Sequence, residues 1–204
     1  MWAPSAEDAA FFEQFGYLHV RGLLKPAEMA TISREFESMM RVPCEAAFDA
    51  KFVRGFEAGP EDRVHLLGGI QHSEALSRWL LTDRRVVDLL SLALGEDFSY
   101  TGGDGNYYNT DTTWHADSST SQWEVAGGEL FSAKLSFYID PLGPDTGALR
   151  VLPGSHRADH WARAAPEPEG GPSLLNRSAE VWGVEPQDVP GAVSLVTEPG
   201  DAIM

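Results

Sequence analysis

The sequence contains a single cysteine, Cys44, among 204 residues. No internal disulfide can form, which fits a reducing compartment, and Cys44 is expected to be a small buried side chain because no reactive motif surrounds it. No apolar run approaches the roughly 20 residues that a membrane-spanning helix needs. The first residues also lack the basic segment and the long apolar segment of a secretory signal peptide. We therefore expect a cytoplasmic protein with no membrane association.

Basic residues are also scarce. Lysine and arginine number 15 against 31 aspartate and glutamate residues, so the formal net charge is -16. Such a chain repels nucleic acid backbones and anionic membrane surfaces, so neither is expected as a partner. The hydrophobic content of 43% and the length fit one domain with a sizeable core. The oligomeric state is left open by the sequence.

The first part of the chain has helical signals. Ser5 and Asp8 have the spacing of a capping box, with aspartate in place of glutamate or glutamine, and Gly16 is placed to end that helix. Pro26 marks the start of a second helix, whose apolar residues recur every three or four positions to about Met40. Two further helices are predicted at 73–81 and 83–94, after a less regular stretch at 43–70.

After residue 96, short segments rich in valine, leucine and aromatic residues alternate with glycine, proline, aspartate and asparagine. This alternation predicts short strands that form an antiparallel barrel or jelly roll. Because the strands follow the predicted helices in the sequence, an α+β fold is expected. A short strand is also predicted at 17–24, and a long polar loop at 158–180. The predicted strands of this half are 98–109, 112–117, 130–140, 148–154 and 191–197.

The segment "NTDTTWHADSSTSQW" at 109–123 places His115 and Asp117 two positions apart. On an extended strand, residues i and i+2 point to the same face, so an imidazole nitrogen and a carboxylate oxygen can reach one ion. A second, distant histidine would complete the facial triad of non-haem Fe(II) oxygenases. Taken alone, the His-x-Asp pattern is weak, and a solvated loop is the competing interpretation.

Four strings give the pattern its context: "FFEQFGYLHVRGLL" at 11–24, "WHAD" at 114–117, "KLSFYIDPLGPDTGALRVLPGSHR" at 134–157 and "PGDAIM" at 199–204. With these strings in this order, the chain resembles the phytanoyl-CoA dioxygenase family of Fe(II)/2-oxoglutarate oxygenases. The resemblance implies a double-stranded β-helix, which is a cupin-like jelly roll, with flanking N-terminal helices. It implies one oxygenase domain over 1–204, with a mainly helical flank at 1–95 and a jelly-roll core at 96–204 that is incomplete at its C-terminal end.

The same resemblance implies that His115 and Asp117 are ligands of Fe(II). The third histidine and an arginine that pairs with 2-oxoglutarate are expected beyond Met204, so we expect the sequence to be a fragment of a longer chain. The implied reaction consumes O2 and 2-oxoglutarate, hydroxylates a C–H bond of a small molecule, and releases succinate and CO2. The presence of Asp117 favours hydroxylation, since related halogenases lack this carboxylate. The third ligand is not assigned to any histidine within the sequence.

Residues near the pair are candidates for the co-substrate and the substrate. Asn106 and Tyr108 share one face of a predicted strand and, with Lys134, are candidates for binding 2-oxoglutarate. Ordinary strand packing and a solvated strand end are the alternatives. Trp114 and Trp123 are candidates for the wall of the substrate pocket, or for the core.

Two other classes of function stay open on the sequence. One is a cupin-like metalloenzyme of another class, such as an isomerase or hydrolase that uses Zn(II) or Mn(II). The other is a non-catalytic module that binds small molecules through a degenerate metal site. The metal that co-purifies separates the first alternative from an oxygenase. A histidine and then an arginine encoded after residue 204 would argue against the second alternative, the non-catalytic module.

Overall fold

The computed structural model describes residues 2–40, 66–107, 114, 124–125, 128–129, 132–157 and 184–204. Within these ranges the chain is α+β, as predicted, with all its α-helices between residues 6 and 94. None of the helices in these ranges is long and apolar enough to cross a membrane.

Helix α1 (Ala6–Phe15) begins and ends at the predicted residues. The Ser5 hydroxyl accepts a hydrogen bond from the Asp8 N–H at 3.1 Å, and the Asp8 carboxylate accepts one from the Ser5 N–H at 2.9 Å. Together these two bonds make the predicted capping box. Gly16 ends the helix in the left-handed conformation (φ 76°), which glycine adopts without steric cost.

Helix α2 (Pro26–Met40) also has the predicted bounds, and its apolar stripe faces the core. The buried residues of the stripe are Met29, Ile32, Phe36, Met39 and Met40. They contact Leu24, Ile70 and Leu76 in one of the two core clusters of the described residues. The three-to-four spacing of the sequence therefore identified the buried face of this helix.

The helix predicted at 73–81 is divided in the structure. Helix α3 (Glu74–Leu76) passes into a π-helical turn, η3 (Ser77–Leu81), which the Thr82 N–H closes on the Ser77 carbonyl at 3.0 Å. The Thr82 hydroxyl donates to the Ser77 and Arg78 carbonyls at 3.3 Å, which satisfies acceptors of the last turn. Helix α4 (Arg84–Leu94) follows and ends before Gly95 (φ 81°), as predicted.

The strands are shorter than the sequence predicted. A three-stranded antiparallel sheet has the order β1 (His19–Val20), β9 (Ala202–Ile203), β6 (Ser136–Phe137). Three antiparallel pairs complete the described strands: β2 (Leu66–Gly68) with β3 (Asp104–Asn106), β4 (Glu124–Val125) with β5 (Gly128–Glu129), and β7 (Leu149–Val151) with β8 (Val193–Leu195). The β4–β5 pair lies in a region where the sequence predicted no strand.

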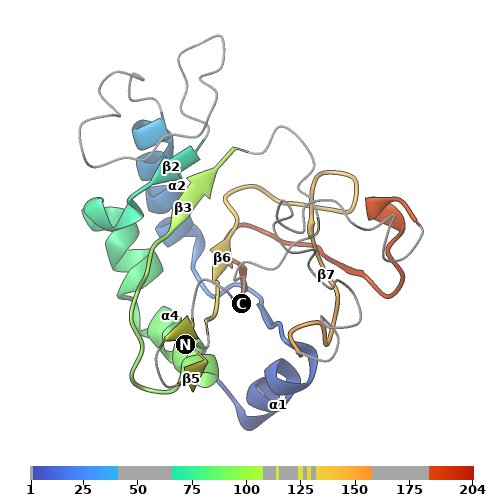
Figure 1. Cartoon of the computed structure of the whole chain (residues 1–204). Helices are drawn as coiled ribbons and strands as arrows, with labels where there is room; N and C mark the ends of the chain where they lie inside the picture. The colour runs from blue at the N-terminus through green and yellow to red at the C-terminus, as the bar shows by residue number, and fades with distance from the viewer. Residues whose placement is uncertain are drawn as a thin grey trace.

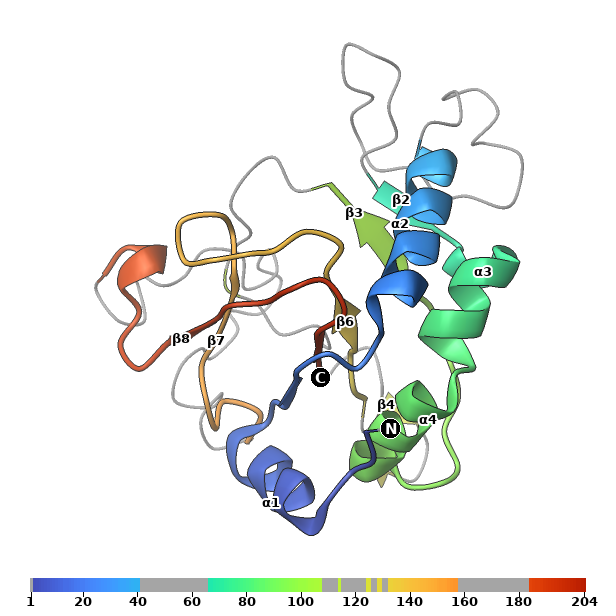
Figure 2. The same ribbon diagram turned by 180° about the vertical axis from the view of Figure 1, so that it is seen from behind.

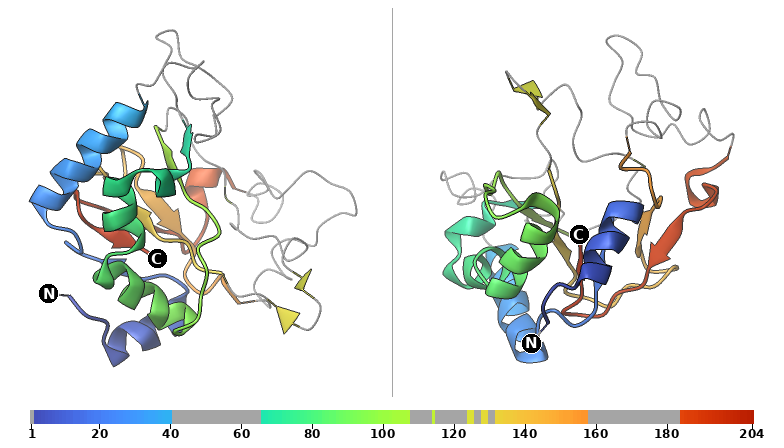
Figure 3. Two further views of the ribbon diagram at one scale, coloured as in Figure 1. Left: turned by 90° about the vertical axis from the view of Figure 1, so that its left-hand side faces the viewer. Right: turned by 90° about the horizontal axis from the view of Figure 1, so that it is seen from below.

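The elements form layers (Figures 1 and 2). Helices α2, α3 and α4 lie on one side of the sheet formed by β1, β9 and β6, while the β7–β8 pair lies on the other side, as the view from below in Figure 3 also shows. Phe137 of β6 packs against both core clusters, one around α2 and one around Val86 and Leu89 of α4. Phe137 of the central sheet therefore connects the two core clusters.

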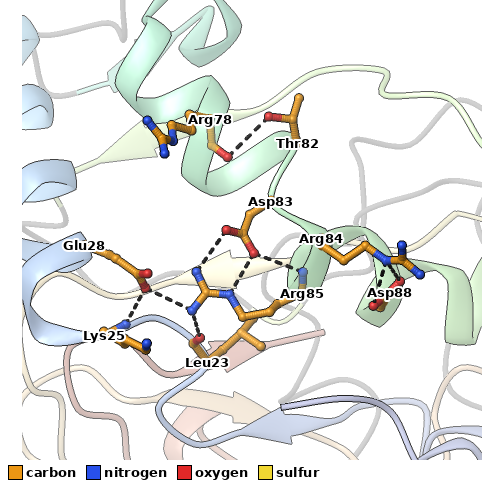
Figure 4. A network of polar contacts seen from close by, with 9 residues as sticks. All are labelled: Leu23, Lys25, Glu28, Arg78, Thr82, Asp83, Arg84, Arg85 and Asp88. Atoms are coloured by element: carbon orange, nitrogen blue, oxygen red, sulfur yellow. Dashed lines mark hydrogen bonds and ion pairs between the residues drawn. The ribbon is translucent and has the colours of Figure 1, made fainter. Parts of the chain in front are cut away.

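A buried arginine connects the starts of two helices (Figure 4). Arg85 of α4 donates to both carboxylate oxygens of Asp83, to the Glu28 carboxylate of α2 at 3.0 Å and to the Leu23 carbonyl at 2.8 Å. The hydrogen bonds from Arg85 hold the pKa of Asp83 below its ordinary value, although burial opposes this. The guanidinium thus satisfies four acceptors and fixes α4 against the segment that leads into α2.

Candidate functional site around Trp114 and the Pro-Gly-Asp turn

Four of the predicted site residues lie outside the described residues: Tyr108, His115, Asp117 and Trp123. Their assignments stay predictions. Asn106, Trp114 and Lys134 are described, and each of the three comes from a different segment of the strand region. Among the residues that the structure describes, no group of three histidine, cysteine, aspartate or glutamate side chains could hold a metal.

Trp114, the residue before His115, is half-buried and has an irregular backbone, although a strand was predicted at 112–117. The guanidinium carbon of Arg150, on β7, lies 5.5 Å from the centre of the Trp114 ring. At this distance a cation is attracted to the negative face of an indole ring. The sequence indicated Trp114 as a pocket residue, but it assigned no role to Arg150, which is 36 positions away.

Asn106 is the last residue of β3 and is half-buried. Its side-chain amide donates a hydrogen bond to the Asp104 carboxylate at 2.7 Å, and β3 pairs with β2 through Asn106 and Leu66. Alternation along a strand places Asn106 and Asp104 on one face, so this hydrogen bond follows from the local geometry.

Lys134 lies two residues before β6 and is exposed. Its neighbours Ala133 and Leu135, together with Phe137, pack against the core cluster on the helical side. In an extended segment, alternate residues point to opposite faces, so Lys134 extends from the face that is turned away from the helices. This alternation favours an orientation of Lys134 toward the side of the sheet where β7 and β8 lie.

The sequence analysis missed the role of Asp201, which belongs to the "PGD" string before β9. This carboxylate is buried, and its Oδ1 accepts a hydrogen bond from the Gly22 N–H at 2.8 Å. Its Oδ2 accepts from the Glu198 N–H at 3.1 Å and lies 3.1 Å from His19 Nε2 and 3.3 Å from Arg21 Nη1. Burial by itself would raise the pKa of Asp201, but these hydrogen bonds outweigh burial and lower it below 3.8.

Two of the described histidines contact other groups of the protein. His19 pairs with Asp201, and its side chain is 13% exposed. His156 of the "PGSH" turn has its Nε2 3.1 Å from the Glu13 carbonyl near the end of α1. His72 is exposed. His19 and His156 therefore each contact a protein group, and the expectation that neither is a metal ligand stays a prediction.

A donor set of one imidazole and one carboxylate is available at positions 115 and 117. Fe(II) in oxygenases is held by two histidines and one carboxylate, so the two side chains fit part of that set. Trp114 precedes this pair, and the structure fixes it against β7. In chemical terms the described residues include an indole ring with a guanidinium over it, directly before the predicted metal-binding pair in the sequence.

Comparison with known proteins gives relatives along nearly the whole chain. The sequence model of the phytanoyl-CoA dioxygenase family (PhyH) matches residues 12–204. The ectoine dioxygenase of Sphingopyxis alaskensis is 25% identical over 211 residues, which cover 94% of this chain and 67% of that protein. The ectoine dioxygenase of Nocardia farcinica is 26% identical over 182 residues, which cover 81% of this chain and 59% of that protein.

The fold is also shared with solved structures. The crystal structure of EctD from S. alaskensis with 2-oxoglutarate and 5-hydroxyectoine superposes with a TM-score of 0.70 at 22% identity, over 100% of this chain and 69% of that one. HygX from Streptomyces hygroscopicus, with nickel, 2-oxoglutarate and hygromycin B bound, gives a TM-score of 0.61 at 16% identity over 98% of this chain and 76% of that one.

The chain spans between about half and two thirds of the length of the curated relatives it matches. The family match over residues 12–204 nevertheless spans helices α2 to α4, the His115–Asp117 pair and the "PGD" turn. The chain therefore belongs to the phytanoyl-CoA dioxygenase family.

Proposed function

We propose that this chain belongs to an Fe(II)- and 2-oxoglutarate-dependent dioxygenase that hydroxylates a C–H bond of a small molecule. The single observation that carries the proposal is the family match over residues 12–204, which includes the His115-x-Asp117 pair. Structures that share the fold contain 2-oxoglutarate, and one structure of EctD contains iron. These ligands support the same cofactor pair for this protein.

In this proposal His115 and Asp117 bind Fe(II) from one face of an extended segment, and a histidine beyond Met204 is the third ligand. When bound, Fe(II) and 2-oxoglutarate would activate O2, one oxygen atom of which would enter the substrate C–H bond and the other the succinate formed with CO2 from 2-oxoglutarate. The central sheet of β1, β9 and β6 and the β7–β8 pair are then parts of a jelly roll that faces the helices. Residues 1–204 belong to one oxygenase domain.

In this proposal the predicted site residues orient the ligands around the metal. Asn106 and Tyr108 would offer polar groups to 2-oxoglutarate, and the Lys134 ammonium, which leaves the sheet on the side opposite to the helices, would pair with a carboxylate. Trp114 and Trp123 would exclude water from the reacting C–H bond, which protects a reactive intermediate from side reactions. The aspartate at 117 supports hydroxylation, because it occupies a coordination position of the metal.

The substrate class is a small polar molecule. The solved relatives hold 5-hydroxyectoine and hygromycin B, which supports this class for the family fold without naming the substrate here. The net charge of -16 makes nucleic acid an unfavourable partner. A small polar substrate would also suit the predicted pocket wall of Trp114 and Trp123.

The test is succinate release from 2-oxoglutarate, with added Fe(II) and O2, by the protein expressed from its complete reading frame. We expect turnover by the wild type and its loss in His115→Ala and Asp117→Ala. The exposed His72 is a matched control, because His72→Ala removes an imidazole far from the pair in sequence and should leave turnover unchanged. Equal turnover in the wild type and both ligand variants would overturn the proposal. Co-purified Zn(II) or Mn(II) with no binding of 2-oxoglutarate would favour another class of metalloenzyme.

A further inference from the structure

Helix α1 contributes less to the core than the other two long helices of the described chain. None of its side chains is buried, whereas α2 buries five and α4 buries three. Phe12 packs against the core cluster around α4, but Phe11 next to it is 37% exposed. Elements with few buried apolar contacts open locally at a lower free energy than the whole fold. The position of α1 therefore depends on its attachments at the surface.

The turn at 152–157 supplies one of these attachments, at the C-terminal end of α1. The last carbonyls of a helix have no partner within the helix. The Gly154 N–H donates to the Phe15 carbonyl at 2.8 Å, and Nε2 of His156 lies 3.1 Å from the Glu13 carbonyl. A carbonyl oxygen only accepts, so the second contact is a hydrogen bond in the tautomer that carries its proton on Nε2. The turn thus caps α1 from a distant part of the sequence.

Gly16 separates the weakly packed helix from a firmly held strand segment. Its backbone is left-handed (φ 76°), and a Cβ at this position would collide with the His156 ring. Two residues later, Leu18 and Met204 exchange backbone hydrogen bonds at 2.8 and 2.9 Å. Hinges are commonly a few residues at the end of an element, where the backbone torsions can change. Gly16 lies at such a position.

Helix α1 also connects the two layers of the protein. In the view from below in Figure 3, it lies between α4 and the turn that follows β7. Phe12 packs on the side of α4, and the turn binds the carbonyls of Glu13 and Phe15. A detached helix of 10 residues is too short to be stable in water. Release of these attachments would therefore expose all the amides of α1 together.

We propose that α1 is a strap that opens as a unit about Gly16, and that the turn at 152–157 is the latch that holds it closed. In the closed state the strap ties α4 to β7. In the open state the part of the α4 cluster under Phe12 is exposed, and the turn after β7 loses its support. The strap thereby couples the positions of the helical layer and the strand layer.

Hydrogen exchange of the protein expressed from its complete reading frame measures the opening, with single amides resolved by electron-transfer fragmentation. The helical amides of α1 should share one protection factor, at least about 100-fold below that of the α2 amides. The Gly154 amide binds the Phe15 carbonyl and should exchange together with α1. Neither Fe(II) nor 2-oxoglutarate enters this measurement, so its outcome leaves the proposed function untouched.

Two variants weaken the strap from its opposite ends. His156→Ala removes the side-chain donor of the latch, and Ser5→Ala removes the cap at the start of α1. Each should speed the exchange of the α1 amides and of Gly154 about fivefold. His156→Gln keeps a side-chain N–H donor and should recover part of the protection. Arg157→Ala, at the exposed neighbour in the same turn, is the matched control and should leave the exchange of α1 unchanged.

Ile32→Val separates opening of the strap from unfolding of the whole protein. Ile32 is buried in the other core cluster, so the loss of one methyl group should speed the exchange of the α2 amides about fivefold. The α1 amides should keep their wild-type rates, because Ile32 stays packed while the strap is open. Faster exchange of α1 in Ile32→Val would overturn the strap, as would equal protection of α1 and α2 in the wild type.

Two further results would overturn parts of the proposal. A response to Ser5→Ala that stays within the first turn of α1 and does not reach Gly154 would show fraying of the helix, and no opening as a unit. An effect of His156→Ala no larger than that of Arg157→Ala would show that the His156 ring is not part of the latch.

Discussion

The helical layer and the strand layer of this protein are held together in different ways. Helices α1, α2 and α4 have 10, 15 and 11 residues, and local signals mark most of their ends. The described strands have only two or three residues, and β1 pairs with β9 across almost the whole chain, through His19 and Ile203. Local signals thus specify the helices, whereas the strand layer depends on contacts between distant segments.

Among the described residues, Arg85 and Asp201 are the two buried charged side chains, and their partners show the same difference. Arg85 is a cation whose acceptors come from the helical layer, namely Asp83, Glu28 and the Leu23 carbonyl. Asp201 is an anion whose donors belong to the 19–22 segment and to its own turn. Arg85 therefore fixes helix to helix, while Asp201 fixes the N-terminal segment to the central strand of the sheet.

The largest effect is expected from Arg85→Met in the helical layer. The variant leaves two partly buried carboxylates next to each other without a cation, and we expect the free energy of unfolding to fall by about 3–5 kcal/mol. Urea unfolding followed by circular dichroism measures this change. Arg84 is a neighbouring arginine whose side chain is 85% exposed, so Arg84→Met should change stability by less than about 0.5 kcal/mol. Equal effects of the two substitutions would show that the Arg85 network does not anchor α4.

Asp201→Asn should have the next largest effect and should act on the strand layer. Both carboxylate oxygens face donors, so either orientation of the amide places its NH2 group against an N–H. We expect a loss of about 3 kcal/mol in the free energy of unfolding. Hydrogen exchange should show faster opening of the amides of β1 and β9 than of α2. Uniform acceleration in both layers would contradict the separate anchoring of the two.

The same aspartate gives the stability a pH dependence. Because hydrogen bonds lower the folded-state pKa of Asp201 below 3.8, its contribution is fully present above that value and is lost as the pH falls through the folded-state pKa. The difference in unfolding free energy between wild type and Asp201→Asn should therefore be constant near neutral pH and shrink in acid below about pH 3.8. A difference that stayed constant down to pH 2 would show that the charge of Asp201 makes no contribution.

Gly16→Ala probes the contact between the two layers. A Cβ at this position would need a left-handed backbone and would collide with the His156 ring. We expect a loss of about 2 kcal/mol. Gly22→Ala is the control, because Gly22 has φ 58° but open space around a Cβ, and should cost about 1 kcal/mol. His156→Ala should relieve part of the cost of Gly16→Ala, and strict additivity would show that the ring does not make the contact.

The smallest effect is expected at the exposed cap of α1. Ser5→Ala removes the acceptor of the Asp8 N–H and should lower the free energy of unfolding by about 1 kcal/mol. Thermal unfolding compares it with Ser5→Thr, which keeps the hydroxyl and should be near wild type. A loss as large as that of Asp201→Asn would show that local helix signals matter as much here as the long-range contacts of the strand layer.

Much of the helical layer could be predicted from the sequence. The capping box of Ser5 and Asp8, the end of α1 at Gly16 and the end of α4 at Gly95 are all present in the structure. The single helix predicted at 73–81 was wrong in detail, because its second part is a π-helical turn. In that turn the Thr82 hydroxyl donates hydrogen bonds to the Ser77 and Arg78 carbonyls. A periodic pattern of apolar residues does not encode these hydrogen bonds.

The strand layer and the candidate site were less predictable. The "PGD" string identified the start of β9, but the role of Asp201 became visible only when its carboxylate was placed against Gly22 and His19. The Arg150–Trp114 contact could not be read from the sequence, because nothing links a strand arginine to an aromatic residue 36 positions earlier. The His115 and Asp117 assignments stay predictions, since both residues lie outside the described part of the chain.

The sequence by itself determined the helices, their caps and the presence of the His115-x-Asp117 pattern, because these features depend on residues that are near each other in the chain. Only the tertiary structure decided which segments meet. It joined β1 to β9 through Asp201, placed the "PGSH" turn on the end of α1 and brought Arg150 over Trp114. Such contacts depend on the entropy lost when distant segments are brought together and on how whole faces of the elements pack. Both contributions arise from the entire fold, so no short sequence pattern encodes them.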